Sequence, residues 1–210
     1  MIDVDAQDTV VDGPRLREAL VRWCDALQAA APELNALDAR LGDGDLGSTL
    51  AKCADNVRSS CAGGAIPLGP ALKQCAMDCA KASGSSFGTL LSVGFLAAAK
   101  AVAARPSLDR DALVDTLMQA HAALSSRGGA ANGDKTMLDS LQAVADAVSA
   151  APAPGDAAAL KSAARTGAQQ ALDAFRDKPN RIGRARMFAD KSVGLDDPGM
   201  VAVLRMTQAL

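Results

Sequence analysis

Apolar residues recur at helical spacing in one segment after another of this chain. Between residues 15 and about 31, leucines and Trp23 form one apolar stripe, as in an amphipathic helix. Pro32 interrupts or restarts this helix, and the leucine pattern then continues to Leu41. Further runs of this kind follow at about residues 48–61, 69–81, 90–104, 106–128, 137–148, 156–177 and 198–210. The pattern therefore predicts an all-α fold of eight helices, arranged as an antiparallel up-and-down barrel or bundle.

Capping residues and connections support this succession of helices. Thr136, with Asp139 three residues later, forms a capping box at the start of one helix. Asp197 and Pro198 provide an N-cap and a first-turn proline for the last helix. The polar, glycine-punctuated loop 178–196 is longer than a plain connector, and loops of this length are usually functional.

The composition is that of a globular protein and narrows the possible partners. At 210 residues the chain suits one domain over residues 1–210, with residues 1–13 expected to be a flexible N-terminal segment. A hydrophobic fraction of 49% with a net charge of −2 excludes a disordered chain. The chain also lacks a basic face interleaved with aromatic residues, so nucleic acid is not the expected partner.

The cysteines and the N-terminus bear on the compartment. Five cysteines, an odd number without a CxxC pair, favour free thiols in a reducing compartment. Cys75 and Cys79 lie one helical turn apart, but as small core residues they need no metal. The acidic N-terminus does not resemble a signal peptide, and no apolar run reaches the ~20 residues that span a bilayer. We therefore expect a cytoplasmic protein without a membrane partner.

The strongest chemical signal is an acidic, glycine-broken turn. Asp38, Asp43 and Asp45 lie close together in the chain and repel one another unless a cation lies between them. Gly42 and Gly44 allow the backbone angles that would bring these carboxylates together. The turn therefore predicts a site for a divalent cation such as magnesium.

A helix start follows directly after this turn. Gly47, Ser48 and Thr49 open the next apolar run, and the N-terminus of a helix is a natural anion site. A cation held by carboxylates beside an anion site is how a protein binds magnesium together with a nucleotide phosphate. A solvated acidic turn with helix-capping aspartates remains the plainer interpretation.

Three other familiar sites fit this stretch less well. Gly42, Gly44 and Gly47 match the GxGxxG dinucleotide fingerprint, but the preceding residues are predicted to be helical rather than a strand. An EF-hand fails because no glutamate occupies the twelfth position counted from Asp43. No lysine of the P-loop kind follows the glycines, which excludes that class as well.

Further polar stretches lie beside other predicted helix ends. Ser83-Gly84-Ser85-Ser86 offers hydroxyls and backbone N–H groups without charge, which suits a phosphate as well as an ordinary turn. Residues 132–137 again precede a helix. Residues 183–199 carry Arg184, whose planar guanidinium pairs well with a phosphate, and Arg186, which is expected to be a solvated charge.

Together these stretches resemble the L-subunit (DhaL) family of dihydroxyacetone kinases, which also forms the nucleotide-binding half of single-chain kinases of this type. The resemblance extends from about residue 14 to the C-terminus. Its matching motifs are 34–38 with Gly42-Asp43-Gly44-Asp45 and Gly47, Ser83-Gly84, Gly133-Asp134-Lys135-Thr136-Met137, Gly183-Arg184-Ala185, and Ser192, Gly194 and Asp197-Pro198-Gly199.

This resemblance implies an eight-helix barrel with a nucleotide at one end. In the family the three aspartates hold two magnesium ions that bridge the phosphates, so Asp38, Asp43 and Asp45 are the expected metal ligands and catalytic residues. The expected contacts with ATP or ADP are Gly47, Ser48, Thr49, Ser83, Gly84 and Ser85 near the phosphates, and Gly133, Met137, Arg184, Asp197 and Pro198 at the ribose and base.

The implied function is that of a phosphoryl-donating subunit of a dihydroxyacetone-type ketose kinase. In the family the ketose is bound covalently to a histidine on a separate K-type subunit, and His121 lies outside every matching motif here. The donor is Mg-ATP, or a bound ADP recharged by a phosphotransferase-system protein, and a homodimer is left open. The alternative is a non-catalytic nucleotide-state sensor that binds a regulator protein.

Three short stretches depart from the usual family pattern. Lys81-Ala82 replace a Gly-Gly pair, and Arg186-Met187 replace the Ser-Tyr that often follows the Gly-Arg-Ala motif. The histidine that the family usually has before the Asp-Pro-Gly motif is absent, and Leu195-Asp196 precede Asp197 here. These departures affect the expected phosphate and base contacts and leave the three aspartates unchanged.

Overall fold

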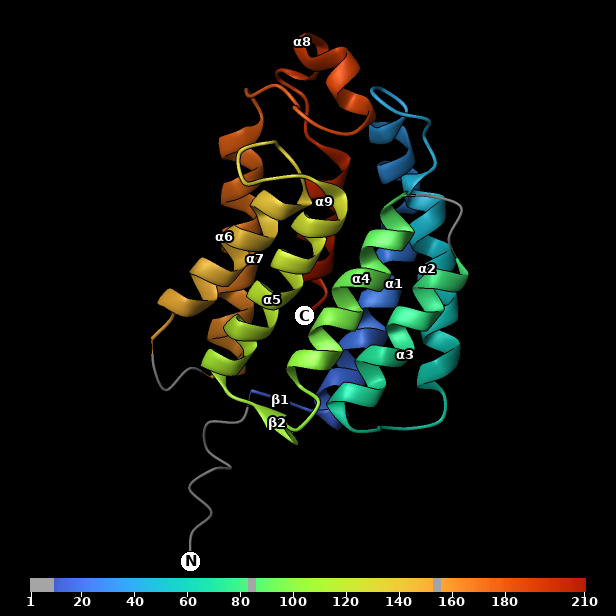
Figure 1. Cartoon of the computed structure of the whole chain (residues 1–210), viewed down its shortest axis with the longest axis vertical. Coiled ribbons are helices and arrows are strands. Elements are labelled where there is room, and N and C mark those ends of the chain that lie inside the picture. Colours follow the sequence, from blue (N-terminus) through green and yellow to red (C-terminus); the bar gives the residue numbers. More distant parts are fainter. Residues whose placement is uncertain (1–9, 83–85, 153–155) are drawn as a thin grey trace, which may run out of the picture.

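The computed structural model describes residues 10–82, 86–152 and 156–210. The regular structure of these residues is almost entirely helical, which confirms the predicted all-α class (Figure 1). The α-helices are α1 (Gly13–Asp38), α2 (Leu46–Cys61), α3 (Leu68–Lys81), α4 (Ser86–Ala101), α5 (Arg110–Gly128), α6 (Met137–Ala150), α7 (Ala157–Phe175), α8 (Ala189–Ser192) and α9 (Pro198–Gln208). The shorter elements are β1 (Val11–Asp12), β2 (Ser107–Leu108) and the 3-10 helix η2 (Arg184–Phe188).

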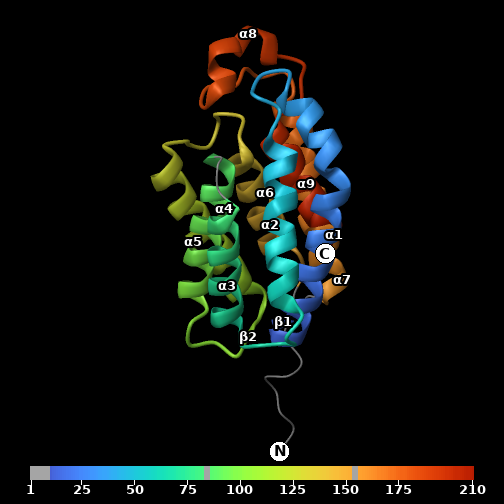
Figure 2. The same cartoon turned by 90° about the vertical axis from the view of Figure 1, so that its right-hand side faces the viewer.

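The eight long helices of the described residues run up and down and close into a barrel (Figure 1, Figure 2). From α1 to α7 each helix packs against the next one in the chain, and α9 packs against both α7 and α1. The predicted eight-helix barrel is therefore confirmed, while η2 and α8 form within the loop predicted at 178–196. The connections α1–α2, α5–α6 and α7–α9 all lie at the same end of the barrel, which brings distant motifs together.

The helix around Pro32 and the start of α4 differ from the sequence pattern. Pro32 lies inside α1 and does not interrupt it. Its side chain is exposed, while Ala30 and Leu34 on either side are buried in the core and hold both halves of the helix in line. Helix α4 begins at Ser86, four residues before the predicted start at 90.

The N-terminal end of the fold contains a small sheet that the sequence pattern did not predict. Strands β1 and β2 pair antiparallel, with Val11 opposite Leu108. Residues 107–108 therefore belong to a strand, and α5 begins later, where the Asp109 side chain accepts from the Ala112 N–H at 2.7 Å. The last residues of segment 1–13, which was expected to be flexible, therefore belong to β1 and the start of α1. Residues 1–9 lie outside the described part.

The core is built from leucines, small residues and one aromatic pair. The rings of Trp23 on α1 and Phe95 on α4 meet edge to face, with their centroids 5.7 Å apart. Two glycines allow neighbouring helices to touch through their backbones, which suits a chain rich in alanine. A Cβ on Gly47 would lie 2.0 Å from the Ala31 carbonyl oxygen, and one on Gly167 would lie 2.5 Å from that of Ala143.

We expect Gly167→Ala to destabilise the protein by about 1–3 kcal/mol, because α6 and α7 must separate to admit the methyl group. Gly94→Ala is the matched control, since Gly94 also lies within a helix and its Cβ would meet Leu124 at an ordinary 3.5 Å. Both variants gain up to about 1 kcal/mol of helix propensity. Urea unfolding measures the difference, and equal effects of the two substitutions would contradict the close approach of α6 and α7.

The cysteines are found as the sequence pattern predicts. All five cysteines have free thiols, and Cys75 and Cys79 are buried core residues. Burial raises the pKa of the Cys75 thiol to about 12. Among the described residues, no helix has the length and apolar character needed to cross a membrane.

Candidate functional site

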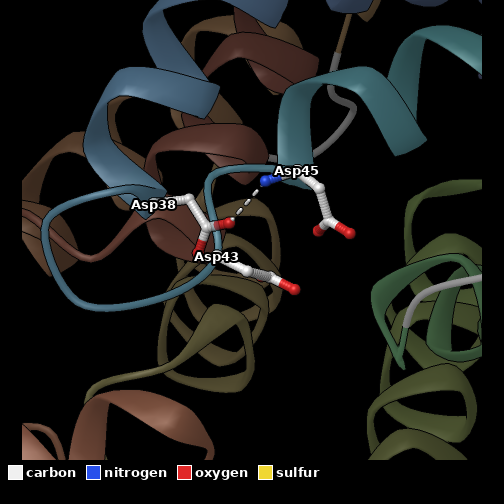
Figure 3. A group of neighbouring side chains, drawn as sticks. All are labelled: Asp38, Asp43 and Asp45. Atoms are coloured by element: carbon white, nitrogen blue, oxygen red, sulfur yellow. Dashed lines mark hydrogen bonds between the residues drawn. The ribbon is translucent and has the colours of Figure 1, made fainter.

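The three predicted aspartates converge at the turn between α1 and α2 (Figure 3). Asp38 is the last residue of α1, Asp43 lies in the turn, and Asp45 is the N-cap residue of α2. Each offers a carboxylate oxygen, and these oxygens lie within 4.8 Å of one another. Among the described residues this is the only group of possible metal ligands of its kind.

The turn is held in shape by Asp38 and by glycine. The Oδ2 atom of Asp38 accepts from the backbone N–H of Asp45 at 3.0 Å and of Leu46 at 3.3 Å, so Asp38 caps α2 from the end of α1. Gly44 has a left-handed φ of +74°, a conformation that glycine adopts readily. A Cβ on Gly42 would lie 2.4 Å from Oδ1 of Asp38, so a side chain there would displace this carboxylate.

The geometry and chemistry of this group fit a hard divalent cation. Magnesium prefers oxygen ligands, and carboxylates supply them together with compensating negative charge. Asp43 and Asp45 are exposed and Asp38 is partly buried, so a cation could reach all three. Asp43 also forms an ion pair with Arg184, which comes from the far end of the chain and counters part of the local negative charge.

A cavity of about 880 Å³ opens beside the aspartate turn. This volume lies in the range that suits a drug-sized ligand or a nucleotide. Residues from five regions form its walls: the α1–α2 turn, the start of α4, the end of α5, the start of α6, and the stretch from Asn180 to Gly199. The cavity therefore gathers most of the motifs identified in the sequence at one end of the barrel.

The walls of this cavity differ in chemical character. The aspartate turn provides the acidic wall, and apolar side chains provide another: Leu41, Leu46, Phe87, Leu90, Leu124, Met137, Leu138 and Ile182. Arg127, Arg184 and Arg186 also line the cavity and supply positive charge. Acidic, basic and apolar walls in one cavity match a ligand with phosphates at one end and a flat ring at the other.

The structure brings together seven of the predicted site residues. Those lining the cavity are Asp38, Asp43, Asp45, Met137, Arg184, Asp197 and Pro198. Ser83, Gly84 and Ser85 lie outside the described residues, although the adjacent Ser86, Phe87 and Thr89 contribute to the wall.

Four predicted residues do not line the cavity. Gly47 is buried against α1, and Thr49 is buried with its backbone N–H donating to the Asp45 carbonyl at 2.9 Å. Ser48 is hydrogen-bonded to Asn35 instead. The Asn35 side-chain NH₂ donates to the Ser48 hydroxyl at 2.9 Å, and its Oδ1 accepts from the Ser48 backbone N–H at 3.0 Å. Gly133 has a left-handed φ of +101° and shapes the turn that precedes α6.

The capping predictions at α6 and α9 are confirmed. Thr136 and Asp139 form the expected capping box at the start of α6. The Asp197 side chain accepts from the Met200 N–H at 3.0 Å and thus caps α9. Burial raises the pKa of Asp197 to about 6, and hydrogen bonds from Met200 and from the Asn180 amide oppose this shift.

Several cavity residues escaped the sequence analysis. Arg127 lies in the last turn of α5, directly before Gly128-Gly129, and a basic residue beside such a helix end is a sequence signal that could have indicated it. Phe87 and Asn180 carry no comparable sequence signal, because their place in the wall depends on how α4 and the C-terminal stretch pack.

Comparison with known proteins now places the chain in a family. Residues 40–210 match the model of the DAK2 domain. The chain is a member of the DAK2 domain family. This DAK2 chain is 30% identical to the Escherichia coli PEP-dependent dihydroxyacetone kinase, ADP-binding subunit DhaL, with 92% of the chain and 95% of that subunit covered. The predicted resemblance to the L-subunit family is thereby confirmed.

Longer relatives match this chain over only part of their length. The chain is 32% identical to human triokinase/FMN cyclase, with 93% of the chain and 34% of that protein covered. It therefore spans about a third of the length of the longer curated relatives. A crystal structure of the Citrobacter freundii dihydroxyacetone kinase matches with a TM-score of 0.72 and 27% identity, over 95% of this chain and 35% of that one. A second structure of the same enzyme, in complex with AMP-PNP and Mg²⁺, has a TM-score of 0.71 and 28% identity, over 95% of this chain and 34% of that one.

Proposed function

We propose that this DAK2 domain is the nucleotide-binding, phosphoryl-donating subunit of a dihydroxyacetone-type ketose kinase. The observation that carries the proposal is the convergence of Asp38, Asp43 and Asp45 on the wall of a cavity of about 880 Å³. Relatives of the chain are named as kinases or as the ADP-binding subunit of one, and a structural neighbour was crystallised with AMP-PNP and Mg²⁺. These names and the geometry support the same assignment.

In this proposal, residues at different places in the cavity have different roles in phosphoryl transfer. Asp38, Asp43 and Asp45 would hold two magnesium ions, which neutralise charge on the phosphates as the phosphoryl group leaves. The apolar wall around Phe87 and Met137 would accept the base. Such a site works by positioning and electrostatic stabilisation, and needs no nucleophile of its own.

Positive charge on the cavity wall formed by the C-terminal stretch suits the phosphates of a nucleotide. Residues 176–192, here named the lid segment, contain six basic and two acidic residues, although the whole chain carries a net charge of −2. Arg184 and Arg186 bring part of this charge to the cavity wall. The guanidinium group is well suited to phosphate oxygens because its planar fork can donate two parallel hydrogen bonds.

The acceptor sugar belongs on another protein in this proposal. The chain's one histidine, His121, bonds through Nε2 with the Asn132 side chain at 2.8 Å and does not line the cavity. It is therefore not placed to anchor a ketose beside the aspartates. A K-type subunit that holds the ketose would complete the site from the open side of the cavity.

Two donor schemes fit this site, and nucleotide retention separates them. The subunit either exchanges ATP in each turnover or keeps ADP, which a phosphotransferase-system protein recharges. ADP that stays bound through gel filtration in magnesium buffer would favour the recharged scheme. Free exchange of labelled ATP would favour the ATP-dependent one.

A reconstitution experiment tests the proposed function. The purified chain is mixed with a K-type subunit, dihydroxyacetone, magnesium and ATP, or with a phosphotransferase donor in place of ATP. Sugar phosphate, measured by a coupled dehydrogenase assay, should form only when both subunits and magnesium are present. Magnesium-dependent nucleotide binding without sugar phosphate under either donor would overturn the kinase assignment in favour of a nucleotide sensor.

A further inference from the structure

Lys135 has an unusual backbone and an unusual side-chain environment. It lies directly before Thr136, the N-cap residue of α6, and has a left-handed φ of +62°. It is the one residue other than glycine with a positive φ among those that the structure describes. This conformation is unfavourable for a residue with a side chain, so other contacts must hold it in place.

The side chain of Lys135 is 1% exposed and fully hydrogen-bonded. Its ammonium group donates to three backbone carbonyls: to Arg176 at 2.9 Å, to Lys178 at 2.8 Å and to Ser192 at 2.8 Å. Because an ammonium group has three hydrogens, these bonds use its whole donor capacity. Burial lowers the pKa of Lys135, and the negative charge of Asp197 opposes this shift.

The position of this cation is not explained by the stability of α6. A positive charge at the N-terminus of a helix opposes the helix dipole, which favours acidic residues there. The three carbonyls that it binds belong instead to the two ends of the lid segment, residues 176–192. Lys135 therefore joins both ends of this segment to the start of α6.

A second set of contacts holds the lid segment at the same place. The Asn180 amide donates to the Lys135 carbonyl at 2.8 Å and to Asp197 at 2.8 Å. The Asn180 backbone N–H donates to the Ser192 hydroxyl at 2.8 Å. Beyond these fixed ends the segment runs along the cavity, where its Arg184 reaches Asp43 on the opposite wall.

We propose that Lys135 is a positioning residue that fixes both ends of the lid segment and thereby sets Arg184 over the aspartate turn. Lys135 itself does not line the cavity, so its influence on a ligand would pass through the lid segment. The consequence for nucleotide affinity rests on the proposed function, whereas the position of the lid segment does not. Lysine suits this task because its ammonium group can donate in three directions from a flexible stem.

Limited trypsin digestion tests the positioning without any nucleotide. Lys135→Met keeps most of the side-chain length and removes the three donors. We expect cleavage after Arg181, Arg184 or Arg186, followed by mass spectrometry, to become about tenfold faster or more, because local opening becomes easier by roughly 1.4 kcal/mol. The matched control is Lys52→Met, at an exposed lysine on α2, which should leave these cleavage rates unchanged.

Lys135→Gly separates the backbone from the side chain. Glycine adopts the left-handed conformation without strain, so a purely conformational role predicts unchanged or slower cleavage. The positioning role predicts faster cleavage for both variants, and unchanged cleavage in Lys135→Met would overturn it. If neither variant folds, Asn180→Ala provides the test instead. It removes the hydrogen bond from the Asn180 amide to the Lys135 carbonyl and should also accelerate cleavage.

A double-mutant cycle connects the lid segment to ligand binding. Affinity for Mg-ADP is measured for Lys135→Met, Arg184→Ala and the double variant. If Lys135 acts through Arg184, the double variant should lose no more affinity than the weaker-binding single variant, within about twofold. Additive losses would overturn action through Arg184. Absence of Mg-ADP binding in the unmodified protein would instead count against the proposed function, and the digestion result would still decide the positioning.

Discussion

Asp45→Asn is expected to lower the affinity for Mg-nucleotide by roughly 100-fold or more, because it removes one charged ligand from the metal group. The fold should be unaffected or slightly stabilised. The Asp45 side chain makes no capping hydrogen bond to α2, and its neutralisation relieves repulsion from Asp38 and Asp43. Titration calorimetry with Mg-ADP and thermal unfolding of the same samples measure the two effects.

Asp115→Asn provides the control for this substitution, since Asp115 is an exposed carboxylate on α5 outside the cavity. It changes the net charge by the same amount and should leave Mg-ADP binding intact. An Asp45→Asn protein that binds Mg-ADP as well as the Asp115→Asn protein would show that Asp45 is not a metal ligand.

Asp38→Ala is expected to damage both the site and the fold. The Asp38 carboxylate is a metal-ligand candidate and also accepts from the N–H groups of Asp45 and Leu46. Its removal should therefore abolish Mg-nucleotide binding and lower the free energy of unfolding by about 1–2 kcal/mol, as for the loss of a helix cap. Urea unfolding without nucleotide measures the second effect separately from the first.

Asp38→Asn distinguishes the two roles of this residue. Asparagine keeps a side-chain oxygen that can accept from the start of α2, so most of the lost stability should return. Its neutral oxygen is a poor substitute for a carboxylate at magnesium, so binding should remain weak. Equal stability of the alanine and asparagine variants would show that the observed bonds to Asp45 and Leu46 contribute little to folding.

The sequence was sufficient for those features that depend on neighbouring residues. The aspartate turn could be predicted because its carboxylates and glycines lie within eight positions of one another. The capping roles of Thr136 and Asp197 could be predicted for the same reason, and the structure confirms both. Helical periodicity likewise gave the eight long helices, because each one buries an apolar stripe in the barrel.

Features that depend on packing between distant segments could not be predicted in this way. Ser48 stands at a helix start, as expected, but Asn35 from the preceding helix occupies its hydrogen bonds. The role of Lys135 depends on carbonyls more than 40 residues away, which no local pattern reveals. The pairing of residues 11–12 with 107–108 likewise joins segments that lie far apart in the chain.

The close contact between Gly47 and the Ala31 carbonyl bears on the energetics of ligand capture. Because α1 and α2 touch through their backbones just below the turn, the separation of their ends is fixed without flexible side chains. The repulsion among the three carboxylates is then overcome during folding, and the group is preorganised when a cation arrives. If the aspartates bind a cation as proposed, folding and metal capture are thermodynamically linked, and the bound cation would raise the stability of the whole barrel.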